Sequence, residues 1–199
     1  MNIRLRTTAA GASTTNSVAQ WDFAMTSIQW VDTTAIPSLT FNLSDNNVGF
    51  GNASAVTARY ATDDAVGTTT SSAIAHALSV STNAVGGYVV AIDGTEPLCL
   101  TSCSGASIDA VGPIATTTNV GTEQFGLNLS TTVGAGVVSS PYNTVNWAYG
   151  TSTFPATVAT GAGDDTTSTF AVRYMTNISA LTESGDYAAV VTYRVTGTF

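Results

Sequence analysis

The sequence of 199 residues contains no lysine, and only 9% of its residues are charged. An ordinary soluble domain has about 25% charged residues. The absence of lysine excludes a P-loop nucleotide site and Schiff-base catalysis, because both depend on a lysine side chain. It also excludes a pilin that is cross-linked by Lys–Asn isopeptide bonds. The remaining function classes are those that need no amine side chain.

Basic residues and histidine are also scarce. Five arginines stand against 13 acidic residues, which gives a formal net charge of −8. Nucleic-acid binding depends on Lys and Arg that neutralise phosphates, so we predict no nucleic-acid partner. The single histidine, His76, excludes a multi-histidine metal site and disfavours a Ser-His-Asp triad. Nothing in the sequence brings His76 together with Glu123, Asp109 or Asp93, so we predict no catalytic residues and no enzymatic activity.

Long apolar runs are absent. No stretch approaches the roughly 20 apolar residues of a membrane span, so we predict none. Residues 1–17 contain arginines but no apolar core, which is not the pattern of a signal peptide. We interpret the start of the numbering as a mature or trimmed end. The composition, rich in Thr, Ser, Gly and Asn, predicts an extracellular protein at the cell surface.

The two cysteines, Cys99 and Cys103, are separated by three residues. An even number at close spacing predicts a small loop closed by a disulfide, with two free thiols as the alternative. Two thiolates without histidine partners fall short of the four ligands of a zinc site.

The residue types that are abundant favour β-structure. Thr, Val and aromatic residues favour strands, while Gly, Asn and Asp favour tight turns. Apolar residues alternate with polar ones in short segments about ten residues apart, which predicts an all-β, antiparallel β-sandwich of the Ig-like or jelly-roll-like kind. We assign residues 18–199 to this single domain and expect long surface loops near 61–72 and 150–168. The segments that show the alternation lie at 39–43, 56–60, 78–80, 88–92, 125–129, 170–178 and 187–199. We expect the last two to be joined by a crossover between sheets or to pair as a hairpin.

Several phrases of the sequence occur together in one group of known proteins. They are His76–Asn83 with Gly87-Tyr88, Ile108–Ala110, Gly121–Gly126, Arg173-Tyr174 with Asn177-Ile178, and Thr182–Tyr187 leading to Thr192-Tyr193 and Phe199. In these phrases residues 40–199 resemble a family of uncharacterised secreted β-rich surface proteins of candidate-phylum (Patescibacteria-type) bacteria. The N-terminus and the Cys99/Cys103 loop depart from that family. The resemblance implies a cell-surface location and no established activity. The layout is also loosely similar to that of β-sandwich filament subunits that polymerise by donor-strand exchange.

The N-terminal extension, residues 1–17, has the pattern of a donor strand. One face of a period-2 strand carries Ile3, Leu5, Thr7, Ala9 and Gly11, and the other face carries Arg4 and Arg6. A donor strand fills a neighbour's groove with alternate side chains while its main chain completes the neighbour's sheet. The alternative is a frayed tail or an ordinary first strand.

Two further groups of residues are candidate ligand contacts. Carboxylates in Gly-rich loops are ligands of the calcium type, but turn chemistry alone also explains them. These carboxylates are Asp63, Asp64, Asp164 and Asp165. Exposed aromatic side chains can stack on sugars, with packing in the core as the alternative. The aromatic set also includes Trp21 and Trp30, and from it we single out Tyr142, Trp147 and Tyr149 as candidate glycan contacts. No other cofactor is predicted.

Together these observations predict an extracellular structural protein that assembles with copies of itself into a surface filament or layer by β-strand complementation. The alternative is a monomeric adhesin or a carbohydrate-binding module that contacts a surface glycan. Lysine side chains on an exposed edge strand commonly prevent that strand from pairing with another chain. Their absence favours a protein whose edge strands pair with other copies.

Overall fold

The computed structural model describes residues 36–94, 97–100 and 105–199. By its contacts the chain divides after Thr34, and all described residues belong to the second unit, 35–199. The predicted extension 1–17 and the start of the predicted domain at residue 18 therefore lie outside the described residues, as do Trp21 and Trp30.

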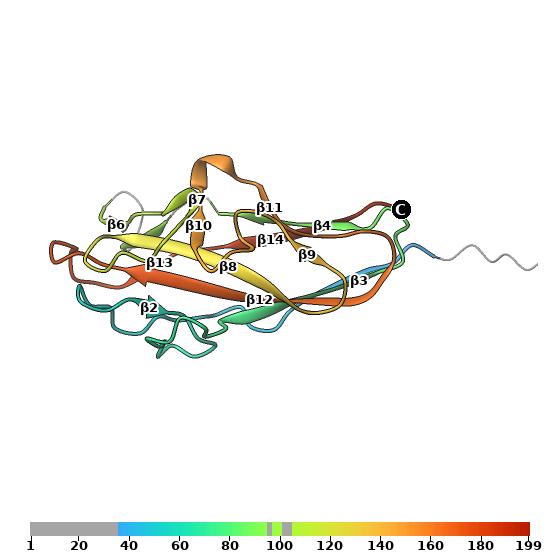
Figure 1. Cartoon of the computed structure of the whole chain (residues 1–199). Coiled ribbons are helices and arrows are strands. Elements are labelled where there is room, and N and C mark those ends of the chain that lie inside the picture. The colour runs from blue at the N-terminus through green and yellow to red at the C-terminus, as the bar shows by residue number, and fades with distance from the viewer. Residues whose placement is uncertain (1–35, 95–96, 101–104) are drawn as a thin grey trace, which may run out of the picture. The chain divides into compact units, whose positions relative to one another are not determined.

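The described residues form an all-β fold in which every pairing between named strands is antiparallel (Figure 1). The larger sheet has the order β1 (Leu39–Leu43), β3 (His76–Thr82), β12 (Asp165–Asn177), β8 (Gln124–Val133), β10 (Trp147–Tyr149) and β7 (Gly112–Thr116), with β2 (Arg59–Tyr60) beside β12. A second sheet has the order β14 (Thr192–Gly197), β4 (Tyr88–Asp93), β11 (Ala156–Gly161) and β9 (Val137–Val138). A third sheet has the order β13 (Tyr187–Ala188), β5 (Leu98–Leu100) and β6 (Ser107–Ile108). A short 3₁₀ helix, Thr151–Thr153, precedes β11.

The third sheet continues the second. β14 pairs with β4 and, further back along both segments, β13 pairs with β5, so that Thr192 lies opposite Asp93 and Tyr187 lies opposite Leu100. The second and third sheets therefore form one layer that faces the larger sheet. The predicted antiparallel sandwich is confirmed.

The core lies between the two layers because alternate residues of each strand point inward. Five of these inward side chains are fully buried: Leu78 of β3, Val90 and Ile92 of β4, and Phe170 and Val172 of β12. Burial of each such side chain contributes about 1.5–3 kcal/mol. These inward residues are the ones that the period-2 alternation predicts.

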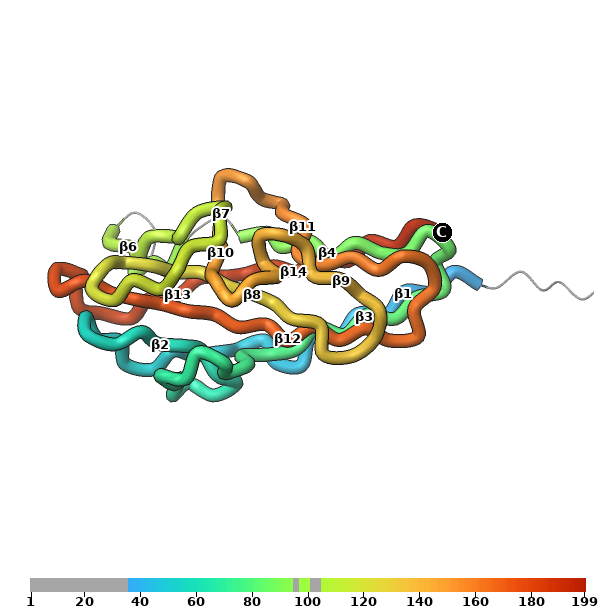
Figure 2. Tube along the Cα trace, in the orientation of Figure 1, coloured from blue at the N-terminus to red at the C-terminus, as the bar shows by residue number. Residues whose placement is uncertain are grey.

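The larger sheet is covered on its outer face too. β2 lies beside β12 (Figure 2) and pairs with it. The ring of Tyr60 packs on that of Trp147, with centroids 5.5 Å apart. Met175 and Ala58 complete this second cluster. Because of this cover, β12 is buried on both faces near its end, and Trp147 is buried rather than exposed.

Two expectations from the sequence are corrected by the fold. The region 150–168 is not a long surface loop, since it contains β11 and the beginning of β12. The small residues of β11 hid the strand, yet Val158 and Ala159 are fully buried. The segment 187–199 is not one continuous strand but divides into β13 and β14. Residues 61–72 form no named strand, as predicted. A crossover between sheets joins β12 to β13, which is the first of the two predicted connections.

The start of β1 and the C-terminal residues lie at one end of this domain (Figure 1). Asn83, which follows β3, accepts a hydrogen bond from Ser38 N and donates one to Ile36 O. Three residues later, Gly86 N donates to Thr198 O. The opposite end of the domain contains the site described next.

Candidate binding groove

A groove of about 860 Å³ opens between the two layers at the end of the domain that lies away from the start of β1. One bank is the segment 45–53 after β1, and the other is the segment 182–193, which includes β13 and the start of β14. Phe125, Tyr174 and His76 belong to its lining and reach the core behind it. We call this feature the edge groove.

The edge groove leaves apolar side chains only half buried. They point toward the core and pack against it, yet no strand covers them from the side of the groove. The half-buried apolar residues of the lining are Leu43, Val48, Phe50, Ile178, Tyr187, Ala189, Val191 and Tyr193. In a closed sandwich these positions would be buried, so the core is incomplete here.

The strands beside the groove have free edges. β1 pairs only with β3, and β14 pairs only with β4, so each exposes one row of main-chain N–H and C=O groups. Charged side chains often protect such edges. β1 carries no charged residue, and β14 carries only Arg194, which forms an ion pair with Asp93 at 3.7 Å. These edges are therefore open to a further strand.

Three aromatic residues form a hydrogen-bonded chain in the wall of the groove. His76 Nε2 lies 3.1 Å from Tyr174 Oη, which lies 2.5 Å from Tyr193 Oη. Burial, opposed in part by the nearby Asp45 carboxylate, lowers the pKa of His76 to about 4. Burial raises the pKa of the Tyr174 and Tyr193 phenols above the ordinary value. All three groups are therefore uncharged at neutral pH.

Buried polar atoms without partners gather at the groove. Three buried side-chain atoms among the described residues have no hydrogen-bond partner, and two of them, His76 Nδ1 and Thr176 Oγ1, belong to groove-lining residues. A buried polar atom without a partner costs about 1–3 kcal/mol. Like the half-buried apolar residues, these atoms indicate that the wall is incomplete.

The candidate glycan contacts lie elsewhere, in the core. Tyr142, Trp147 and Tyr149 are 2%, 3% and 0% exposed. Phe125 packs against Tyr149 with ring centroids 4.7 Å apart. None of the three offers a ring face to a sugar, so the prediction of a glycan contact at these residues is wrong, and packing in the core is correct.

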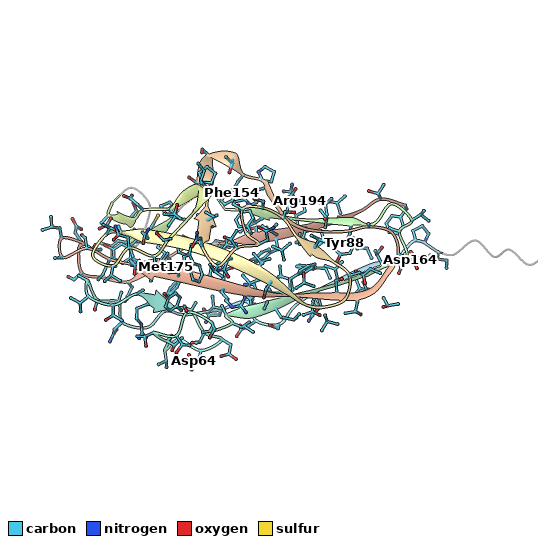
Figure 3. All side chains as sticks on the ribbon, in the orientation of Figure 1. Asp64, Tyr88, Phe154, Asp164, Met175 and Arg194 are labelled. Carbon is cyan, nitrogen blue, oxygen red and sulfur yellow. The ribbon has the colours of Figure 1, made fainter. Side chains whose placement is uncertain are left out.

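The candidate calcium ligands lie in two separate places, one at Asp64 and the other at Asp164 (Figure 3), just before and at the start of β12. Asp64 Oδ1 accepts hydrogen bonds from Thr62 Oγ1 at 2.5 Å and from Val66 N at 3.0 Å. These hydrogen bonds lower the pKa of Asp64. Asp165 Oδ2 accepts from Ser168 Oγ at 2.5 Å and from Tyr88 Oη at 3.3 Å. Asp63 and Asp164 are their chain neighbours, and no group of three or more metal-ligating residues occurs in the part of the chain that the structure describes. Hydrogen bonds within the domain engage the carboxylates of Asp64 and Asp165, and calcium binding at the four aspartates stays a prediction.

The other candidate residues are dispersed. Glu123 accepts a hydrogen bond from Thr182 Oγ1 at 2.5 Å, and neither it, Asp93 nor Asp109 belongs to the lining of the groove that contains His76. Cys99 takes part in a disulfide bond, whereas Cys103 lies outside the described residues, so their pairing stays a prediction. The candidate donor residues Ile3, Leu5, Thr7, Ala9 and Gly11 also lie outside the described residues.

The edge groove itself was not foreseen from the sequence. Its two banks lie about 140 residues apart in the chain, and only the pairing of the strands brings them together. One signal was present: the alternation in 187–199 has an apolar face whose partner strand the sequence does not identify.

No family model, curated protein or solved structure matches this chain. In the described residues, no helix has the length and apolar character needed to cross a membrane.

Proposed function

We propose that the protein is an extracellular, non-enzymatic structural subunit that assembles with copies of itself into a cell-surface filament or layer. Assembly proceeds by β-strand complementation, in which the N-terminal segment of one copy occupies the edge groove of the next. Ile3, Leu5, Thr7, Ala9 and Gly11 face the core of the acceptor. A head-to-tail contact of this kind does not close on itself and therefore gives an extended assembly.

The incomplete core at the edge groove carries this proposal. A strand placed between the banks would bury the half-buried apolar residues and hydrogen-bond to the free edges of the sheets. Each Ile or Leu side chain that becomes fully buried contributes about 1.5–3 kcal/mol. The main-chain hydrogen bonds add affinity that does not depend on side chains.

The lengths also agree. The C-terminal bank from Tyr187 to Tyr193 comprises seven residues, which span at most roughly 23 Å when extended. The candidate donor residues from Ile3 to Gly11 span nine residues, which is enough to cover these seven. The donor segment can therefore follow the whole of this bank.

Two observations support an extracellular location. Cys99 is disulfide-bonded, and disulfides persist mainly in oxidising compartments. The surface lacks lysine, and only 9% of all residues are charged. A monomeric adhesin or carbohydrate-binding module is the alternative, and the experiment below separates it from a self-assembling subunit.

The test compares the full chain with a variant that lacks residues 1–12, by light scattering and electron microscopy. We expect large species from the full chain and, from the truncated variant, a folded monomer lighter than the 20.2 kDa of one full chain. A synthetic peptide of residues 1–12 should bind the truncated variant in a fluorescence anisotropy titration. Equal assembly by both proteins would refute the donor role, and a full chain that stays near 20 kDa would favour the monomeric alternative.

A matched pair of variants tests the acceptor. Val191 is a half-buried residue of the groove, whereas its neighbour Val190 is 81% exposed and lies outside the lining. Val191→Glu should prevent assembly and peptide binding, because it places a charge among the half-buried apolar residues of the groove. Val190→Glu should leave both unchanged. Loss of assembly in both variants, or in neither, would contradict the assignment of the groove as acceptor.

A further inference from the structure

The mouth of the edge groove carries acidic side chains on both banks. Asp45 lies on the bank after β1, and Glu183 and Asp186 lie on the bank before β13. The lining contains no arginine. Among the described residues the one ion pair joins Arg194 to Asp93, so these three carboxylates have no cationic partner there.

The arginines of the described domain are already engaged. Arg59 donates hydrogen bonds to Phe50 O at 2.9 Å and to Val66 O at 2.7 Å. Arg173 donates to Ser130 Oγ at 2.9 Å, and Arg194 pairs with Asp93.

The remaining two arginines, Arg4 and Arg6, both lie in the N-terminal segment. Residues 1–17 contain no acidic residue, whereas all 13 acidic residues lie beyond residue 21. The segment and the mouth of the groove are thus opposite in charge.

The alternation of the segment places these charges where the mouth can receive them. Side chains of a strand point to opposite faces with a period of two. When Ile3 and Leu5 face the apolar residues of the groove, Arg4 and Arg6 must point the opposite way, toward the solvent side, where the two banks carry their acidic residues. A shift by one residue would put the arginines on the apolar floor, so the charges also enforce the register.

We propose that Arg4 and Arg6 of the donor copy bind between Asp45 on one bank and Glu183 and Asp186 on the other, and thereby select the partner and fix the register of the inserted strand. This inference rests on the proposed function and adds the residues that make the contact specific. Complementary charge across an interface raises the rate of association and rejects wrong partners more than it adds affinity.

The test uses charge reversal on each side of the contact in the full chain. The donor variant Arg4→Glu/Arg6→Glu places acids against acids, and the acceptor variant Asp45→Arg/Asp186→Arg places arginines against arginines. For each variant alone we expect the critical concentration for assembly to rise at least about tenfold, because like charges are then brought together across the interface. An equimolar mixture of the two variants should assemble again, since the donor of each then matches the groove of the other.

The control variant Asp63→Arg/Asp109→Arg raises the net charge by the same amount as the acceptor variant does, but at exposed positions outside the groove. It should assemble as the wild type does. Circular dichroism checks the fold of each variant. If the donor variant assembles at the wild-type critical concentration, or the mixture fails to assemble, the charge contact is refuted. If that happens while removal of residues 1–12 still abolishes assembly, the proposed function survives and only this inference fails. An insertion of the segment into its own groove would not be rescued by mixing.

Discussion

The buried histidine makes the stability of the domain depend on pH in a way that can be calculated. His76 is 5% exposed, and burial lowers its pKa from 6.5 to about 4. The unfolded chain therefore binds a proton between pH 6.5 and pH 4 that the folded domain does not bind. Stability rises with pH wherever the unfolded state binds more protons, so this contribution is complete above pH 6.5 and is lost as the pH falls to 4.

The magnitude follows from the difference between the two pKa values. One pKa unit corresponds to 1.36 kcal/mol, so the difference of roughly 2.5 units amounts to about 3 kcal/mol. The groups that face His76 are Tyr174 on β12, Tyr193 on β14 and the carboxylate of Asp45. The two tyrosines stay uncharged across this range because burial raises their pKa values.

The assay is urea unfolding of the full chain and of His76→Gln at several pH values from 7 to 4, at protein concentrations below the one at which light scattering detects assembly. The free energy of unfolding should fall between pH 6.5 and pH 4 by about 3 kcal/mol more in the wild type than in the variant. The comparison cancels the contribution of the carboxylates to the pH dependence, because they titrate in both proteins. His76 is also the single histidine, so its proton NMR signal reports its pKa without an assignment problem. Equal pH profiles, or a signal that titrates near pH 6.5 in the folded protein, would refute the reasoning.

Three further predictions concern the domain itself. Phe170→Ala should lower the free energy of unfolding by about 3–5 kcal/mol, because the ring is fully buried between the layers, while Val133→Ala, at a 56% exposed position, should change it by less than about 0.5 kcal/mol. Gly87→Ala should be destabilising by more than about 1 kcal/mol in the same urea assay, because Gly87 has φ +76° and an added Cβ would lie 1.9 Å from Gly161 O; an unchanged midpoint would contradict that geometry. Addition of a calcium chelator should leave the melting temperature unchanged, since Asp64 and Asp165 are satisfied by hydrogen bonds within the domain; a fall on chelation, reversed by calcium, would show that these turns bind the ion.

The strands with strong alternation were predictable from the sequence. Leu39, Phe41 and Leu43 recur at every second position and form β1, and Tyr88, Val90 and Ile92 do the same in β4. Such a pattern has one physical solution, a strand with one buried face. The sandwich follows, because two such layers must cover each other.

The strands without this pattern were not predictable. β11 has the sequence ATVATG, in which small and polar residues give no contrast between its faces. The Trp147–Tyr149 strand is buried on both faces because Tyr60 covers the outer one, and that cover comes from a segment almost 90 residues earlier. Local periodicity cannot report a contact of this range.

The edge groove could not be predicted from the sequence for a related reason. Phe50 and Tyr187 are half buried because no strand of the described domain covers them at the groove, and a sequence pattern records an apolar face without recording whether it is covered. The charge asymmetry between residues 1–17 and the rest was visible, but its meaning depends on where Asp45 and Asp186 lie in the fold.

The positions of the start of β1 and of the edge groove, at opposite ends of the domain, have a mechanical consequence. In the proposed assembly each subunit is pulled at Ser38, where the chain enters the domain, and at the groove, where the neighbour's strand is held. The pull then runs along β1, β3 and β12, parallel to the strands. Their hydrogen bonds lie across the direction of force and bear it together in shear, instead of opening one after another like a zipper. Such a chain of subunits would therefore resist tension.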